Sequence, residues 1–145
     1  MPEARAPITR RGDYAAFHAI VTRWMDNDAL GLINNVTYYS FFDTAVTAWL
    51  LTNGLMGLRD GPMWVVAETG CRFLKEVAFP DPIEIGLKVA RIGASSVRYE
   101  LAVFRGPDDQ ASAQGHFTHV HVSRTDRRPY PMPEAIRLQL SDLQR

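Results

Sequence analysis

The chain has only one cysteine, Cys71, among its 145 residues, and this excludes an internal disulfide bond. Residues 1–13 contain prolines and charges but lack the apolar stretch of a secretory signal. No segment reaches the roughly 20 consecutive apolar residues that a membrane-spanning helix needs. Because a lone cysteine is compatible with a reducing compartment, we expect a cytoplasmic protein with no membrane partner.

An excess of charge of either sign is also absent. The 16 lysine and arginine residues balance 16 aspartate and glutamate residues. No strand with interleaved basic and aromatic residues is evident either, so the sequence does not favour a nucleic-acid partner. The chain does have apolar residues, which make up 46% of it, and its length suits one domain over residues 1–145.

Hydrophobic patterning predicts a long helix early in the chain. Apolar side chains recur at helical spacing on two flanks between Val36 and Asn53, which predicts a largely buried helix. Asn34 or Asn35 can cap the start of this helix, and Gly54 can end it. An apolar, partly β-branched segment before it, Ala16–Trp24, predicts a first strand.

After the helix, the hydrophobic period changes to two, which is typical of strands. Turn sequences separate four such segments, at Met63–Leu74, Pro82–Ile92, Ser96–Arg105 and Ala111–Ser123. A flexible polar arm is predicted at residues 1–14, and a short C-terminal helix and tail at residues 133–145. Strands in succession form antiparallel sheets, and this one must curl around the long helix to bury its aromatic residues. We therefore predict an α+β fold with about five strands.

Carboxylates and amides are concentrated immediately before the long helix, in Asp26-Asn27-Asp28 and Asn34-Asn35. A helix N-terminus presents unpaired N–H groups and a positive dipole, which can polarise a carbonyl oxygen. Asp28 could attack that carbonyl or activate a water, and the sequence does not separate the two roles. Asp26 could raise the pKa of Asp28 by like-charge repulsion, or it could hold the turn by accepting hydrogen bonds from loop N–H groups. We favour the second role.

Three segments carry a resemblance to a known family. They are Asp26–Asn35 followed by Tyr38, then Phe73-Leu74-Lys75-Glu76-Val77, and then Arg91-Ile92-Gly93-Ala94-Ser95-Ser96. In order and spacing, residues 15–131 resemble the hotdog-fold acyl-CoA thioesterases of the 4-hydroxybenzoyl-CoA thioesterase type. The resemblance implies a hotdog fold, a homo-oligomer that is a dimer or tetramer, and hydrolysis of an acyl thioester of CoA or acyl carrier protein. It implies no metal and no organic cofactor.

Position by position, the resemblance implies that Asp28 is the catalytic carboxylate and that the helix start at Asn34–Val36 holds the thioester oxygen. Many relatives have Gly-His-Val-Asn-Asn where this chain has Gly31-Leu32-Ile33-Asn34-Asn35. The contribution of that histidine is therefore missing. This departure leaves a non-catalytic thioester-binding or oligomerisation module as an alternative, and Leu32 argues against an acyl-thioester dehydratase.

A thioester substrate also needs an acyl pocket and groups that bind the phosphates of CoA. For the acyl pocket we predict Tyr38, Phe41, Phe42 and Trp64, although aromatic residues at helical spacing are also typical of a core. For CoA we predict Lys75, Arg91, Ser95, Ser96 and Arg98, which ordinary solvated surface positions would equally explain.

Other reactive side chains receive structural interpretations. His119 and His121 lie on one face of a predicted strand at a spacing that can chelate a metal, but no cysteine or carboxylate with ligand spacing accompanies them. We therefore expect ordinary strand histidines. Asp43 is an alternative base on the helix, although its polar neighbours favour a solvent-facing position. Cys71 is expected to be a small buried residue.

Overall fold

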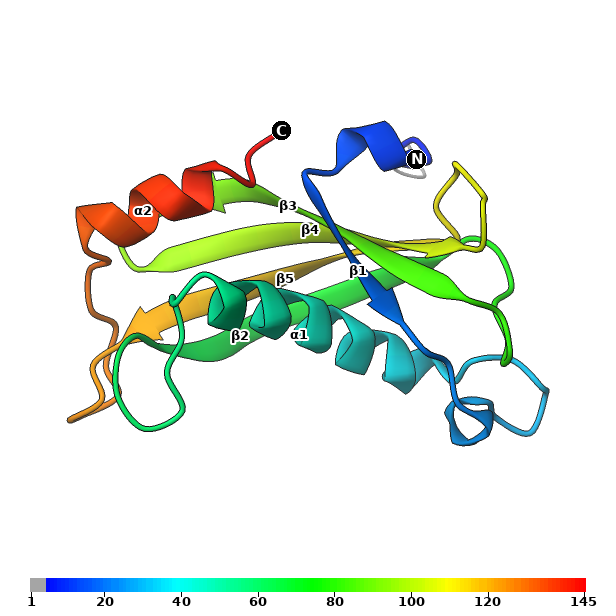
Figure 1. The fold of residues 1–145 in the computed structure, drawn as a ribbon, viewed down its shortest axis with the longest axis horizontal. Coiled ribbons are helices and arrows are strands. Elements are labelled where there is room, and N and C mark those ends of the chain that lie inside the picture. The colour runs from blue at the N-terminus through cyan, green and yellow to red at the C-terminus, as the bar shows by residue number, and fades with distance from the viewer. Residues whose placement is uncertain (1–4) are drawn as a thin grey trace.

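The computed structural model of the chain describes residues 5–145, which form one antiparallel sheet with a long helix lying across one face (Figure 1). The five strands lie in the order β1-β3-β4-β5-β2. They are β1 (Ala16–Ile20), β2 (Met63–Phe73), β3 (Ile83–Ile92), β4 (Ser96–Arg105) and β5 (Ala113–Val122), and the helices are α1 (Asn35–Thr52) and α2 (Glu134–Ser141). The predicted hotdog arrangement is therefore confirmed.

The face of the sheet that contacts α1, here called the inner face, contains most of the core. Alternate residues of β4 from Val97 to Val103 point to it and are fully buried, as the period of two predicted. Helix α1 buries both of its apolar flanks, including Tyr38, Phe42 and Leu50. A helix that is apolar on two sides needs cover on two sides, and the curled sheet provides it.

The opposite, outer face of the sheet is more polar and only partly covered. The segment before β1 packs on one end of it, where Tyr14 is 3% exposed and meets Phe104 edge to face. Arg11 strengthens this contact, because its guanidinium stacks over Phe104 and ion-pairs with Glu84 at 2.7 Å. The predicted arm at residues 1–14 is thus packed on the sheet from Thr9 onward, and its first four residues lie outside the described part of the chain.

Strand β1 is shorter than predicted, since it ends at Ile20 rather than Trp24. Trp24–Asp26 forms a 3-10 turn instead. Asp26 causes this change, because its buried carboxylate accepts the Arg23 N–H at 2.8 Å and the Arg23 guanidinium at 2.9 Å. The turn-holding role favoured for Asp26 is what the structure shows.

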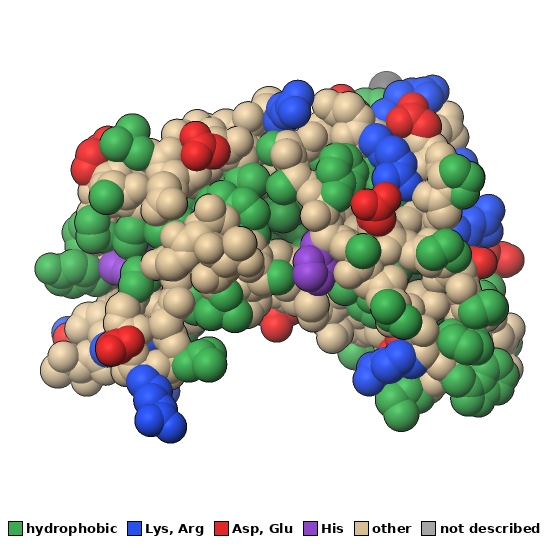
Figure 2. Space-filling model, in the orientation of Figure 1, with side chains coloured by type: hydrophobic (Ala, Val, Ile, Leu, Met, Phe, Trp, Pro, Cys, Tyr) green, Lys and Arg blue, Asp and Glu red, His purple; other side chains and the backbone are tan. Residues whose placement is uncertain are grey.

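Apolar side chains remain uncovered over the loop that joins β1 to α1. Figure 2 shows hydrophobic side chains gathered at this corner, and Val21, Trp24, Met25 and Leu30 are each more than 70% exposed. Scattered exposed apolar residues are normal on a protein surface, but several in one loop mark an unpartnered region.

The other elements follow the prediction to within two residues at each end, including the strand expected at Ala111–Ser123, which begins at Ala113. Asn34 caps α1 by accepting the Val36 N–H at 3.0 Å, and Gly54 follows the helix with a φ of 68°. Helix α2 closes one end of the core with Ile136 and Leu140. No helix within residues 5–145 is long and apolar enough to cross a membrane.

Candidate active site

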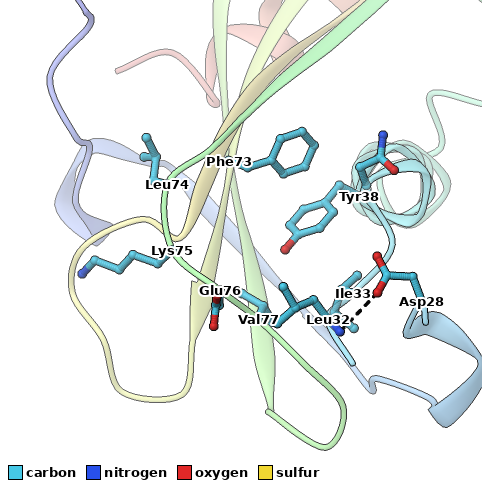
Figure 3. A pocket seen from close by; sticks show the side chains of 10 residues that line it. Asp28, Leu32, Ile33, Tyr38, Phe73, Leu74, Lys75, Glu76 and Val77 are labelled. Carbon is cyan, nitrogen blue, oxygen red and sulfur yellow. Dashed lines mark hydrogen bonds between the residues drawn. The ribbon is translucent and has the colours of Figure 1, made fainter. Parts of the chain in front are cut away.

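A cavity of about 310 Å³ opens beside the first turn of α1 (Figure 3). Two segments that are distant in sequence form its walls. One is the loop before α1 together with the first turn of that helix, and the other is the segment that continues from the end of β2. The lining residues are Asp28, Leu32, Ile33, Asn35, Tyr38, Phe73, Leu74, Lys75, Glu76 and Val77.

Backbone hydrogen bonds hold the two walls together. The Ile33 N–H donates to the Val77 carbonyl at 2.8 Å, and the Phe79 N–H donates to the side-chain oxygen of Asn27 at 3.0 Å. The second wall is tied to the sheet as well, since the N–H groups of Leu74 and Lys75 both donate to the Ser112 carbonyl. The cavity is therefore built into the backbone framework.

Asp28 is half-buried at the edge of this cavity in a closed loop. Its N–H donates to the Leu32 carbonyl at 2.8 Å, and its carbonyl accepts the Gly31 N–H at 3.1 Å. One carboxylate oxygen, Oδ1, accepts the Leu30 N–H at 2.8 Å and the Leu32 N–H at 3.5 Å, the contact drawn in Figure 3. The other oxygen, Oδ2, accepts no hydrogen bond from residues 5–145. The loop therefore orients the carboxylate and leaves one oxygen available.

The start of α1 offers one open N–H group at the cavity. The Asn34 N–H donates to the Asp26 carbonyl, and the Val36 N–H donates to the capping side chain of Asn34. The Thr37 N–H donates to the Asn34 carbonyl. The Asn35 N–H has no acceptor among residues 5–145, and Asn35 lines the cavity. Of the predicted stretch Asn34–Val36, the structure thus leaves a single amide free at this site.

The apolar side of the cavity contains two aromatic rings. Tyr38 and Phe73 meet edge to face with their centroids 4.9 Å apart, and the Tyr38 hydroxyl points into the cavity in Figure 3. Burial raises the pKa of Tyr38 to about 12, so its hydroxyl stays protonated at neutral pH. Phe73 is 48% exposed, so this side of the cavity is partly open to solvent. Asp28 belongs to the same wall of the cavity as Tyr38, and Phe73 belongs to the other wall.

Several predicted pocket residues lie in the core and do not line this cavity. Phe41 and Phe42 point from α1 onto the sheet and are 6% and 0% exposed. Trp64 lies near the opposite end of α1, where its indole N–H donates to the Leu55 carbonyl at 2.7 Å. Helical spacing explains the difference, because only Tyr38 lies close enough to the helix start to reach the cavity.

The predicted CoA-binding residues are also separated. Lys75 lines the cavity, but its ammonium group donates to the Gln110 side chain at 3.0 Å and extends away from Asp28 (Figure 3). Arg91 and Arg98 are paired across β3 and β4. Ser95 lies in the turn between these strands, and Ser96 begins β4. None of these four residues lines the cavity beside Asp28.

The two strand histidines lie in an aromatic cluster in the core. His119 stacks on Trp64 with centroids 5.7 Å apart and meets Phe117 edge to face at 4.9 Å. Burial lowers the pKa of His119 to about 4, which keeps the ring neutral at physiological pH. His121 donates through its Nδ1–H to the Tyr130 carbonyl at 2.8 Å. Within residues 5–145, no three potential ligands gather to hold a metal ion.

Two other expectations concern Cys71 and Asp43. Cys71 is half-buried at the margin of the core, where desolvation raises the pKa of its thiol to about 12. Its thiol is therefore protonated and weakly nucleophilic. Asp43 is exposed on α1 and does not line the cavity.

Residue-by-residue reasoning misses most of the second wall. Phe73 and Val77 enter the sequence prediction only as parts of a family motif, and Lys75 alone receives a role there. The sequence does contain a signal for this wall. Apolar residues, Phe73 and Val77, lie on either side of Lys75-Glu76 where strand β2 ends. The hydrogen bond between Ile33 and Val77 that brings this segment to the helix start has no sequence signature.

A curled antiparallel sheet around a central helix is the hotdog fold, and in this chain a carboxylate and a free amide lie at the helix start. The model of the thioesterase-like superfamily matches residues 22–140, and the chain belongs to that superfamily. The match spans both walls of the cavity.

Solved structures agree with this assignment. The PA5185 protein of Pseudomonas aeruginosa strain PAO1 is 46% identical, with a TM-score of 0.91 over 95% of this chain and 97% of that one. PA2801, a putative thioesterase of the same species, is 29% identical, with a TM-score of 0.77 over 88% and 98%. A Thermus thermophilus thioesterase complexed with coenzyme A and Zn is 26% identical, with a TM-score of 0.73 over 89% and 93%.

A curated protein gives a weaker match. The uncharacterized protein YsmA of Bacillus subtilis (strain 168) is 26% identical over 84 residues, which are 58% of this chain and 57% of YsmA. The matched stretch thus spans just over half the length of that relative. Together, the superfamily and the neighbours named as thioesterases support thioester hydrolysis as the general class of activity.

Proposed function

We propose that this protein is an acyl-CoA thioesterase in which Asp28 acts as general base or nucleophile and the Asn35 N–H polarises the thioester carbonyl. The observation that carries the proposal is that Asp28 and Asn35, the latter with a free N–H, border the same cavity. A thioester carbonyl has weak resonance stabilisation and a good leaving group, so a carboxylate and one oriented donor are sufficient machinery for its hydrolysis.

In the general-base route, Asp28 takes a proton from water as the water oxygen bonds to the thioester carbon. The negative charge that develops on the carbonyl oxygen is stabilised by the Asn35 N–H and the positive end of the α1 dipole. Collapse of the tetrahedral intermediate breaks the carbon–sulfur bond, and the proton held by Asp28 passes to the leaving thiolate. In the nucleophilic route, Asp28 itself bonds to the carbon, the thiolate leaves, and water hydrolyses the resulting mixed anhydride.

The substrate assignment rests on the walls of the cavity and on one relative. Tyr38, Phe73 and Val77 provide an apolar surface for an acyl group next to Asp28. The T. thermophilus thioesterase contains coenzyme A, which favours an acyl-CoA over other thioesters for this chain too. An acyl carrier protein thioester presents the same reacting group and stays an alternative substrate.

We propose further that the working protein is a homo-oligomer. Strand β2 is at one edge of the sheet and, within residues 5–145, pairs only with β5, while Val65 and Val66 on it are 38% and 49% exposed. An uncovered apolar edge strand is a template for pairing with another chain. Because the cavity wall continues directly from the end of β2, a second copy paired there would lie beside the open side of Phe73. Light scattering should therefore give a mass of two or four times 16.3 kDa, and a monomer would contradict this proposal.

The function is tested by measuring thiol release from a panel of acyl-CoA substrates. Asp28→Asn should lower turnover by about a hundredfold or more, because the amide can neither accept a proton nor attack the carbonyl. Circular dichroism should show an unchanged fold, since only Oδ1 takes part in the loop hydrogen bonds. Asp43→Asn is the matched control and should retain full activity, because Asp43 is exposed outside the cavity.

The result also separates the alternatives. A large loss in Asp43→Asn with none in Asp28→Asn would make Asp43 the base and would overturn the proposed role of Asp28. A non-catalytic binding module is favoured by one observation, that Leu32 lines the cavity where many relatives have a histidine. Tight acyl-CoA binding with no turnover by the wild-type protein would decide for that module.

A further inference from the structure

A second cavity, of about 330 Å³, lies on the outer face of the sheet. It shares no lining residue with the cavity at Asp28. Strands β2, β5 and β4 form its floor, and the segment before β1 forms one side. The polar residues that line it include Arg72, Arg98, Glu100, Gln114 and His116.

The strand register places two arginines on either side of a histidine. On β5, His116 pairs with Gly70 of β2 and Glu100 of β4. Two residues before His116 on β5, Gln114 pairs with Arg72 of β2. Two residues after His116, Thr118 pairs with Arg98 of β4. Residues two apart on a strand share a face, so both guanidinium groups project from the same side as the His116 ring.

The charged residues that line this cavity are Arg72, Arg98 and Glu100, and the Glu68 carboxylate lies beside the His116 ring. Within residues 5–145, neither Arg72 nor Arg98 forms an ion pair or a side-chain hydrogen bond, whereas the carboxylate of Glu100 lies 3.6 Å from the Lys88 ammonium. Arg91 is directly opposite Arg98 on the neighbouring strand β3. Like charges in directly opposed positions destabilise a sheet, and a bound anion would relieve that repulsion.

The His116 ring is placed by its neighbour on β2. A Cβ atom at Gly70 would lie 2.6 Å from His116 Nε2, so the ring fits there because position 70 has no side chain. The Nδ1 atom of this ring is buried without a hydrogen-bond partner and lies 3.7 Å from the Glu68 carboxylate.

We propose that this outer-face cavity is a binding site for a phosphate monoester, held by Arg72 and Arg98 with His116 and Gln114 beside them. Guanidinium groups bind phosphate through pairs of parallel charge-assisted hydrogen bonds, and two unpaired arginines facing one cavity match a doubly charged anion. The phosphate could belong to the nucleotide end of a CoA-type substrate or to a separate phosphorylated metabolite. Binding at this site does not depend on the chemistry proposed for Asp28.

Isothermal titration calorimetry with adenosine 3′,5′-bisphosphate and with inorganic phosphate tests the site. Arg72→Gln and Arg98→Gln should each weaken binding of both compounds about tenfold or more, because each removes a charge-assisted hydrogen-bonding group. Arg128→Gln is the matched control, since Arg128 is an exposed arginine beyond the far end of β5. This variant should bind both compounds with the same affinity as the wild-type protein. Thermal unfolding of each variant shows that the fold is retained.

The proposal is overturned if both arginine variants bind these compounds as tightly as the wild type, or if the wild type binds neither. Comparing CoA with dephospho-CoA, which lacks the 3′-phosphate, then identifies the source. If loss of that phosphate weakens binding to the wild type but not to an Arg72→Gln/Arg98→Gln variant, the substrate supplies the phosphate. If both proteins bind CoA and dephospho-CoA alike and inorganic phosphate binds alongside CoA, the ligand is a separate phosphate. None of these measurements requires turnover, so they stand apart from the assay of hydrolysis.

Discussion

The two ends of helix α1 use similar residues for different purposes. At its start, Asn34 caps the helix but leaves the Asn35 N–H open at a cavity. At its end, Asn53 donates to the Trp49 carbonyl through both its side chain and its backbone, and the Leu55 N–H donates to the Leu50 carbonyl. The Trp64 indole then covers the chain that leaves the helix.

Under the proposed function, this difference lets one helix support both stability and chemistry. Every α-helix has unpaired N–H groups at one end and unpaired carbonyl groups at the other, and a fold must satisfy or use them. Here a buried tryptophan and a glycine turn close the C-terminal end, whereas a loop carrying Asp28 leaves the N-terminal end open. Perturbing the open end should therefore change turnover, and perturbing the closed end should change stability.

The largest effect is expected from removing the open N–H itself. Asn35 is the first helical residue, where proline is well tolerated, and Asn34 before it already has the extended backbone that a following proline requires, with φ −58° and ψ 134°. Asn35→Pro should keep the helix and lower kcat by about a hundredfold or more, as loss of an oxyanion donor does. Thiol-release kinetics with several acyl-CoA substrates would measure this.

Asn35→Ala is the control for this experiment, because it removes the side chain and keeps the N–H. It should retain activity close to that of the wild type. Equal turnover in the proline and alanine variants, with both folded by circular dichroism, would show that the open amide takes no part in catalysis.

A smaller effect, on stability only, is expected at the closed end. Burial lowers the pKa of His119 to about 4 from an ordinary value near 6.5, so the unfolded chain binds a proton on this ring at a higher pH than the folded chain does. Stability from the neutral ring is complete above about pH 6.5 and is lost as the pH falls toward 4, by up to about 3 kcal/mol. Urea unfolding between pH 7 and pH 4.5 measures this loss.

His119→Phe should remove this part of the acid destabilisation while it keeps the stacking on Trp64 and Phe117. Its kcat at pH 7 should match that of the wild type, because His119 does not line the Asp28 cavity. An identical loss of stability in His119→Phe and wild type would refute the assignment.

Most of the fold could be predicted from local patterns. The period of two placed β4 at its observed bounds, and two apolar flanks located α1 to within one residue at each end. The error at the end of β1 arose because Val21 and Trp24 look like strand residues, although both are highly exposed and Asp26 turns the chain there. A side chain that accepts a backbone N–H can override the hydrophobic pattern.

The candidate site could be predicted only in part. Asp28 and the helix start were found because they are close in sequence and because they match a family motif. The aromatic residues were harder to assign, since Phe42 and Tyr38 belong to the same helix and differ mainly in their distance from its first turn. Periodicity distinguishes buried from exposed positions, but it does not distinguish a core contact from a cavity wall.

Residue order alone was enough to establish the long helix with its Asn34 cap, the succession of strands and the carboxylate before the helix, because these depend on neighbours within a few positions. Folding in three dimensions was needed to bring Val77 against Ile33, to leave Asn35 as the free amide, and to set Arg72 and Arg98 around His116. These contacts join residues tens of positions apart, and their geometry follows from strand register and backbone hydrogen bonds between distant segments, for which no short pattern exists.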